Sequence, residues 1–462
     1  MGIYQIKEFG KIKSSEDYPD HAESDSEITI PNSSFNNIWD YILEQQSIDN
    51  SIEKAFKLFT KKGKRVLQVQ NYVGVIETRQ KDIIEILPKI YSSDSLLNLD
   101  ESKNIFLKML STLRNSPFLS MQTASIDSKS NFPILEIFVE NYIQEVEQLV
   151  LLGLKNDYLK TEDNISYLKG SLIFNRHLQR NLLDKSRFYV RYIKYQVNIP
   201  QNKIIKATLR KLVNISVSSK NRGKLTHLLN LFSRIDDSQN IISDLAMSQN
   251  KSRLFSNYSK IIEWSETFLL NKGFTNFSGN SINQAILFPM EKIFENFIAY
   301  LFRKYSSDYQ ITTQHREYFL VDKHRDRPRF QLRPDIFARN DKDDKRPVVI
   351  DTKWKVIDET KPSKNYLIKQ SDMYQLYAYG RKYTLGYSEP LLYLIYPMTN
   401  TFKKGIDSFF YEESGGNYHL ELRAVPFDLS NTTNYSTQLT NILERIDRLD
   451  TENNRTFMEN SA

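Results

Sequence analysis

Two aspartates and a lysine in the C-terminal half of the chain have the types and spacing best suited to chemistry. Asp351 and Lys353 close the apolar run at residues 348–350, and Asp335 ends a Pro-Asp pair in an earlier short extended stretch. Because residues i and i+2 of a strand share a face, Asp351 and Lys353 point the same way and Asp335 can lie opposite them. Two carboxylates can hold a hard cation while the ammonium lies beside its bound water. The pattern therefore suits phosphodiester hydrolysis, although it is short enough to occur often by chance.

The residues around this pattern predict a small α/β sandwich. Apolar residues at helical spacing predict a helix over residues 290–305, with Glu291 and Glu295 on one of its faces. A second helix is expected over residues 371–383. Strands are expected over residues 318–321, the stretch that runs into Asp335 and Phe337, residues 347–354 and residues 391–396, with polar turns at 323–327 and 340–345. This order puts the aspartates on central strands and Glu295 on the helix packed against them.

The N-terminal half is predicted to combine a β-hairpin with helices. Residues 72–77 and 83–87 read as two strands joined by a polar turn. Helical spacing of apolar residues predicts helices around residues 35–43, 106–113 and 134–154. The last stretch is the most apolar of the chain, but its four glutamates favour an amphipathic helix over a membrane span.

The expected fold is therefore α+β and multi-domain, with a β-hairpin and helical region followed by the α/β sandwich. The expected parts are a partner-docking region over residues 1–155, a basic helical section over 156–280, the sandwich over 281–430 and a helical tail over 431–462.

The composition of this 462-residue chain excludes several kinds of site. Without cysteine there can be no disulfide framework or thiolate metal site, and the six scattered histidines give no metal-binding spacing. No GxxxxGK[ST] phosphate loop is present, so nucleotide hydrolysis by that route is not expected. The first residues lack the long apolar segment of a secretory signal. We expect a soluble cytoplasmic protein that does not bind a membrane.

Positive charge is concentrated in one section of the chain. The formal net charge is +7, and residues 164–224 hold fourteen Lys and Arg against one acid, Asp184. Six aromatic residues are interleaved with them, a mixture that suits a polyanion. The same section could instead bind the acidic or nucleotide-bearing surface of a protein, or form a solvated face above core aromatics.

Several motifs together resemble a known family. Residues 286–397 are similar to the PD-(D/E)xK (restriction-endonuclease-like) nuclease fold, and within it to McrC, the nuclease subunit of McrBC restriction systems. The matching pieces are FENF (294–297), LRPDIF (332–337), VVIDTKWK (348–355) and DMYQLYAYG (372–380). The N-terminal half adds NYVGVIE (71–77), EILPKI (85–90), YLKG (167–170) and NIPQNKIIKATL (198–209). The resemblance covers most of the chain between residues 65 and 400.

The resemblance implies roles for individual residues. Asp335 and Asp351 would be ligands of Mg²⁺, and Lys353 would position the attacking water or help to deprotonate it. Glu295 would be an outer ligand or a water-mediated contact of the metal. Gln375 and Tyr379 match a QxxxY element and would contact the scissile strand or orient Lys353. Glu291 competes with Glu295 for its role.

The resemblance also implies partners. These are double-stranded DNA and a McrB-like AAA+ GTPase, which recognises and translocates DNA and whose hydrolysis the subunit stimulates. Related subunits also serve multi-subunit type II restriction systems such as BsuMI, which cut unmethylated sites and contain further subunits. Two rival interpretations are a self-sufficient RecB-like or repair nuclease, and a non-catalytic adaptor that activates the NTPase ring. The intact acidic pair and lysine argue against the adaptor, since an inactive site has no need of buried like charges.

Overall fold

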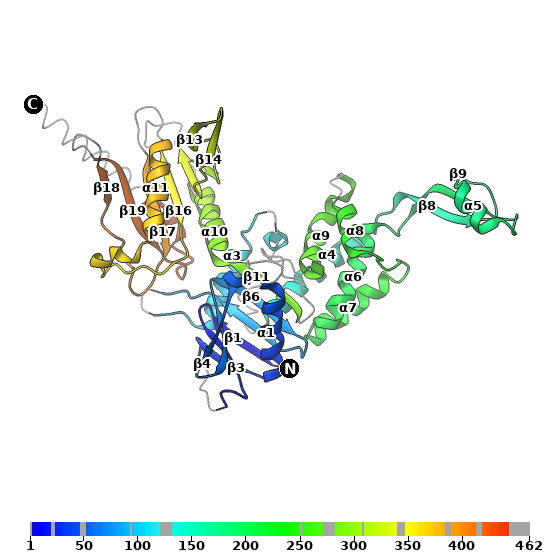
Figure 1. Ribbon diagram of the computed structural model, residues 1–462, viewed down its shortest axis with the longest axis horizontal. Coiled ribbons are helices and arrows are strands. Elements are labelled where there is room, and N and C mark those ends of the chain that lie inside the picture. The colour runs from blue at the N-terminus through cyan, green and yellow to red at the C-terminus, as the bar shows by residue number, and fades with distance from the viewer. Residues whose placement is uncertain are drawn as a thin grey trace, which may run out of the picture. The chain divides into compact units, whose positions relative to one another are not determined.

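The computed structural model is a multi-domain α+β fold that divides into two compact units (Figure 1). One unit consists of residues 1–2, 75–83 and 132–286, and the other of residues 3–74, 84–131 and 287–462. The second unit thus contains the strands within residues 3–69 and nearly all of the expected α/β sandwich. The residues that the structure describes are 2–19, 24–46, 52–92, 95–114, 116–120, 132–249, 253–270, 282–306, 309–339, 347–383, 390–412 and 418–442.

A six-stranded sheet forms the centre of the C-terminal part of the second unit. Its strand order is β12-β15-β16-β17-β19-β18. β16 is antiparallel to β15 but parallel to β17, and β17 is parallel to β19. Every residue of β16 and β17 is buried, as expected of central strands that are covered on both faces. The strands are β12 (Gln310–Thr313), β15 (Ile336–Arg339), β16 (Val348–Thr352), β17 (Leu391–Pro397), β18 (Phe409–Glu412) and β19 (Tyr418–Phe427).

Two helices pack against this sheet. α10 (Met290–Tyr305) contacts β12 and β16, whereas α11 (Gln370–Lys382) contacts β16, β17 and β19. α11 approaches the sheet closely at Gly380, where a Cβ atom would lie 2.8 Å from a side-chain carbon of Leu420. Glycine is therefore required here for close packing rather than for a special backbone conformation.

The predicted helices and buried strands of the sandwich are confirmed, but one strand differs. The stretch before Asp335 forms β14 (Arg327–Gln331), which pairs only with β13 (Phe319–His324) as a separate antiparallel hairpin. The strand does not continue into Asp335 because Phe330 has a left-handed φ of 58° and Pro334 lacks a backbone N–H. β12, β18 and β19 were not predicted, and the expected turn at 340–345 lies outside the described residues.

Two further sheets contain the N-terminal strands. Their orders are β3-β2-β5-β4 and β1-β7-β6-β11, so the predicted pairing of residues 72–77 with 83–87 is confirmed as β6 and β7. The strands are β1 (Ile3–Lys7), β2 (Lys11–Ser14), β3 (Glu27–Ile30), β4 (Phe56–Lys61), β5 (Lys64–Val69), β6 (Tyr72–Thr78), β7 (Ile83–Leu87) and β11 (Ile282–Pro289). The helices of this region are α1 (Asn32–Gln46), α2 (Ile52–Ala55) and α3 (Leu99–Leu110).

The section that was expected to be basic and helical is only partly helical. Residues 157–196 form a three-stranded sheet, β8-β10-β9, with one short helix. β10 is rich in aromatic and β-branched residues, which favour strands over helices. Figure 1 shows this arm, residues 157–196, extending from the helices of the same unit. The arm consists of β8 (Asp157–Ile165), β9 (Ser171–Leu172), α5 (Phe174–Asn181) and β10 (Phe188–Gln196), and the helices are α4 (Ile134–Leu152), α6 (Pro200–Ile215), α7 (Ser219–Leu231), α8 (Ile241–Ser248) and α9 (Ser259–Leu270).

Near the C-terminus, residues 435–442 are helical, and the rest of the expected tail after residue 442 lies outside the described residues. Among the helices that the structure describes, none combines the length and the apolar character needed to cross a membrane.

Candidate active site

The structure brings the predicted aspartates and lysine together at the ends of β15 and β16. The antiparallel register of these strands carries Asp335, which directly precedes β15, to the end of β16. There Thr352 donates hydrogen bonds to Asp335 Oδ2 from its backbone nitrogen, at 2.7 Å, and from its Oγ1, at 2.8 Å. Lys353, the next residue, forms an ion pair with Asp351. The two carboxylates and the ammonium therefore converge from adjacent strand ends.

Both aspartates are buried carboxylates whose protonated form is favoured. Asp335 exposes 9% of its surface and Asp351 only 1%. Burial raises the pKa of each to about 7, and the repulsion of a second carboxylate adds to it, from Glu295 on Asp335 and from Asp335 on Asp351. The charge of Lys353 and the hydrogen bonds from Thr352 offset only part of these effects. The site thus holds more negative charge than its neighbours neutralise, a condition that favours an added cation.

Lys353 is held in its charged form. Burial lowers the pKa of its ammonium, but the attraction of Asp351, Asp335 and Asp372 outweighs burial and leaves the pKa raised. Lys353 Nζ also donates a hydrogen bond of 3.4 Å to Gln375 Oε1. A protonated lysine suits the positioning of water and the stabilisation of negative charge better than proton abstraction.

Glu295 reaches the site from α10 through a glutamine that sequence reasoning missed. Gln314 Nε2 donates to Glu295 Oε1 at 2.6 Å and to Asp335 Oδ1 at 3.3 Å. The backbone nitrogen of Gln314 donates to the carbonyl oxygen of Asp335 at 3.1 Å. Its φ of 50° is left-handed, so this side chain is placed at the cost of backbone strain. Burial, with the charge of Asp351 adding to it, raises the pKa of Glu295.

Glu291 lies elsewhere, although it is four residues from Glu295 on the same helix. It lines a separate cavity with Glu8 and Trp354 and is exposed. Of the two competing glutamates, the structure therefore places only Glu295 among the site carboxylates.

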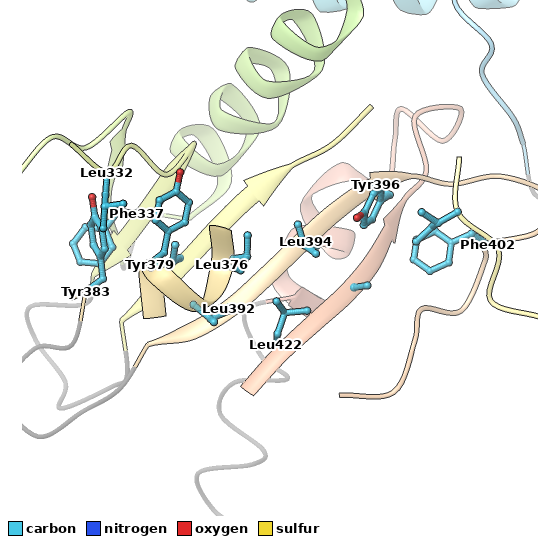
Figure 2. Close-up of a cluster of buried hydrophobic side chains, with 13 residues drawn as sticks. Leu332, Phe337, Leu376, Tyr379, Tyr383, Leu392, Leu394, Tyr396, Phe402 and Leu422 are labelled. Atoms are coloured by element: carbon cyan, nitrogen blue, oxygen red, sulfur yellow. The ribbon is translucent and has the colours of Figure 1, made fainter. Parts of the chain in front are cut away.

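Gln375 and Tyr379 lie one helical turn apart on α11 and contact each other. Gln375 Nε2 donates to the Tyr379 hydroxyl at 2.7 Å and to Asp351 Oδ1 at 3.4 Å. The Tyr379 hydroxyl in turn donates to the carbonyl oxygen of Arg333 at 3.0 Å. Figure 2 shows Tyr379 at one end of a buried cluster, near Tyr383. The cluster fixes the ring, and the ring orients the glutamine that holds Lys353.

The donor set can be compared with the needs of a metal ion. Within the described ranges, no group of three or more carboxylate or imidazole residues is placed to hold a metal by itself. Mg²⁺ commonly takes only one or two protein carboxylates and retains several waters. Asp335 and Asp351, with their excess negative charge, meet this smaller requirement, and Glu295 lies behind them with its carboxylate occupied by Gln314.

Comparison with known families identifies the chain. A family model described as "McrBC 5-methylcytosine restriction system component" matches residues 67–397. The chain belongs to this family. No curated protein was found to match the chain.

Two solved structures are similar to this chain. One is the "Refined half-complex from tetradecameric assembly of Thermococcus gammatolerans McrB AAA+ hexamers with bound McrC", with 15% identity and a TM-score of 0.64 over 95% of this chain and 100% of that one. The other is the "Cryo-EM structure of the Thermococcus gammatolerans McrBC complex", with 15% identity and a TM-score of 0.45 over 67% of this chain and 89% of that one. At this identity, the first of them supports a shared fold.

Sequence reasoning missed two further contacts, which hold the segment that follows β16. Just beyond Lys353, Lys355 forms an ion pair with Asp372 of α11, with its Nζ 2.8 Å from Oδ2. Trp354 Nε1 donates to both carboxylate oxygens of Glu8, each at 3.0 Å, and Glu8 follows β1. Helical spacing places Asp372 one turn before Gln375, a signal that could have been found. The partners of Trp354 and Gln314 are distant in sequence and carry no such signal.

The raised pKa of Asp351 predicts how stability depends on pH. Between pH 4 and 7 the unfolded chain has lost the Asp351 proton while the folded chain retains it, so stability falls as pH rises through this range. We expect Asp351→Asn, which removes the charge, to raise the thermal unfolding midpoint in metal-free buffer. The corresponding gain in the free energy of unfolding should increase from pH 5 to pH 8, and reach about 1–3 kcal/mol after allowance for the lost Lys353 ion pair.

The measurement is a series of thermal unfolding curves of the variant and the unsubstituted chain across this pH range. A difference in midpoint that stays constant, or that shrinks as pH rises, would show that the carboxylate is not destabilised by burial.

Proposed function

We propose that the chain is the DNA endonuclease subunit of a McrBC-type restriction system, that it cuts phosphodiester bonds with Mg²⁺, and that its fold is of the PD-(D/E)xK type. The observation that carries this proposal is the convergence of Asp335, Asp351 and Lys353 at adjacent strand ends. The fold assignment is supported by the six-stranded mixed sheet, whose strand β16 is contacted by both α10 and α11.

In this proposal each side chain has a defined task. Asp335 and Asp351 would hold Mg²⁺, which supplies Lewis-acid charge stabilisation and an activated water. Lys353, protonated and held by Gln375, orients the attacking water and stabilises charge on the phosphate. Glu295 fixes Gln314, which in turn holds Asp335.

The first test removes the carboxylates one at a time. We expect Asp335→Asn and Asp351→Asn to reduce DNA cleavage to background and to abolish the thermal stabilisation by Mg²⁺, because each removes a ligand charge. Lys353→Met should also abolish cleavage but retain Mg²⁺ stabilisation. Cleavage is measured in the complete restriction system and stabilisation on the isolated chain.

A matched pair on α10 serves as the control for this test. Glu295→Gln should lower cleavage, whereas Glu291→Gln, one turn away, should leave it unchanged. Full cleavage by Asp351→Asn, or equal effects of the two glutamate variants, would contradict the assignment.

The second test concerns Gln375. Because it orients Lys353 rather than binding metal, Gln375→Ala should lower the single-turnover cleavage rate by about 10–100-fold, or about 1–3 kcal/mol, with Mg²⁺ stabilisation intact. Tyr379→Phe, which removes only the hydroxyl partner, should have a smaller effect. A Gln375→Ala rate equal to that of the unsubstituted chain would remove this residue from the mechanism.

We further propose that the chain acts with a McrB-like AAA+ GTPase and that its arm, residues 157–196, contributes to docking. The similar structure contains McrB AAA+ hexamers with bound McrC. In the arm, apolar side chains are widely exposed, including Leu183 at 97% and Ile193 at 60%. Exposed apolar residues among basic ones are typical of a protein-binding surface. Arg176 and Arg191 are paired with Glu162, so part of the positive charge is already neutralised.

The third test separates docking from chemistry. The full chain carrying Asp335→Asn should still raise GTP hydrolysis by the cognate GTPase, whereas Leu183→Asp with Ile193→Asp should reduce that stimulation at least ten-fold. Hydrolysis is measured as phosphate release at saturating GTP. Specific cleavage by the chain without the GTPase would favour a self-sufficient nuclease. Stimulation without cleavage under any metal or DNA condition would favour an adaptor.

A further inference from the structure

The β13–β14 hairpin is a strongly basic projection that the proposed catalytic residues do not use. Residues 316–333 contain six Lys and Arg and three acids. All residues from Asp322 to Phe330 are exposed. Figure 1 shows the hairpin extending beyond the six-stranded sheet near α10 and α11. Two antiparallel strands standing free of a sheet have little core of their own, so their side chains are available to a partner.

The base of the hairpin is fixed to the candidate active site. Leu332 donates its backbone N–H to the carbonyl oxygen of Tyr318 at 2.9 Å, and the Tyr318 ring packs on Tyr383 with centroids 4.7 Å apart. The Tyr379 hydroxyl donates to the carbonyl oxygen of Arg333. Closer to the turn of the hairpin, Lys382 of α11 forms an ion pair with Asp322 of β13 at 2.7 Å. The hairpin is therefore held in a defined direction by the helix that positions Gln375.

The outer part of the hairpin carries cations without intramolecular partners. Across the described residues, the guanidinium groups of Arg325, Arg327 and Arg329 form neither an ion pair nor a hydrogen bond. His324 pairs with Arg327 in the ladder, so Arg325 and Asp326 form the two-residue turn. Their φ values of 46° and 61° are left-handed, a conformation for which Asn and Gly are the usual choice. The turn thus carries an arginine where a purely structural turn would favour a smaller residue.

An exposed apolar pair lies beside these arginines. Phe319 pairs with Gln331 and Val321 with Arg329, so Leu320 lies opposite Phe330 in the ladder. Leu320 is 47% exposed, and Phe330 is 73% exposed with a left-handed φ of 58°. A phenylalanine in a strained backbone conformation with its ring largely in solvent gains little from packing within the chain. The pair suits contact with an external surface.

The hairpin is close to the scissile position in the proposed function. Arg329 precedes Asp335 by six positions, which limits the distance between them to roughly 20 Å of extended chain. This is the rise of about six base pairs of duplex DNA. A two-stranded ribbon also has the dimensions that fit the major groove.

We propose that the β13–β14 hairpin is a duplex-DNA-binding element that holds the substrate beside Asp335. Arg325, Arg327 and Arg329 contact backbone phosphates, and Leu320 and Phe330 pack against the groove. This inference rests on the proposed nuclease function, because it identifies how that site holds its substrate. The surface is suited to DNA rather than to a protein because its charge is positive and its arginines lack internal partners.

The test compares two triple variants of the full chain with equal charge removal. One is Arg325→Gln with Arg327→Gln and Arg329→Gln. The control is Lys57→Gln with Lys61→Gln and Lys62→Gln, on the exposed β4–β5 hairpin of the same unit. The probe is a fluorescent 30-base-pair duplex in EDTA, and its affinity is measured by anisotropy over a range of salt concentrations.

We expect the arginine variant to lose at least ten-fold in affinity at low salt and the slope of log affinity against log salt to decrease by about 2–3. The lysine control should retain both. Phe330→Ala should lower the affinity about 3–10-fold with an unchanged salt slope. Thermal unfolding midpoints of all variants are compared, so that a loss of fold is recognised.

The outcomes separate this inference from the proposed function. Asp351→Asn should bind the duplex with the full salt slope although it does not cut. Equal affinity of the two triple variants, or the absence of duplex binding by the unsubstituted chain, would overturn the role of the hairpin and leave the proposed nuclease intact. Loss of GTPase stimulation by the arginine variant without loss of DNA affinity would also overturn it, since the surface would then bind protein. If the arginine variant loses DNA affinity but the unsubstituted chain never cuts DNA, the binding role of the hairpin is supported and the proposed nuclease function is rejected.

Discussion

Negative charge buried at the ends of two strands is the constraint that organises this site. Burial raises the pKa of both Asp335 and Asp351, the charge of Glu295 raises that of Asp335 further, and the charge of Asp335 raises that of Asp351. The surrounding groups offset these effects only in part. Thr352 donates two hydrogen bonds and Lys353 supplies a positive charge. A buried pair of like charges is unfavourable unless its surroundings hold it in place. The side chains packed around Asp335 and Asp351 therefore serve to hold these two carboxylates in place.

That support comes from α11 and from the N-terminal strands. α11 is joined to the segment that follows β16 by the Lys355–Asp372 ion pair and packs closely on the sheet at Gly380. Trp354, the residue after Lys353, donates from its indole to Glu8 near the start of the chain. Burial raises the pKa of Glu8 to about 7, with the backbone N–H of Lys89 and the indole of Trp354 acting in the opposite direction. The N-terminal strands and the site thus belong to one compact unit, so a change in either affects the other.

The division into two units is consistent with separate tasks in the proposed function. The candidate active site and the basic hairpin lie in the unit that contains residues 287–462, whereas the arm with its exposed apolar side chains lies in the unit that contains residues 132–286. Chemistry on DNA needs a rigid arrangement of charges, while docking needs accessible apolar surface.

The sequence by itself determined the elements with strong periodicity and the residues that follow them. Apolar spacing identified α10, α11 and the buried strands β16 and β17, and motif spacing identified Asp335, Asp351 and Lys353, because these signals are local. The Gln375–Tyr379 pair was implied by the resemblance to McrC. Tertiary structure alone decided which of Glu291 and Glu295 reaches the carboxylates, since both lie on the same helical face. It also revealed Gln314, whose role depends on a left-handed backbone and on residues from two other elements. The short strands β12 and β18 escaped prediction for the same reason, because four residues at a sheet edge are fixed by their neighbours and not by their own pattern.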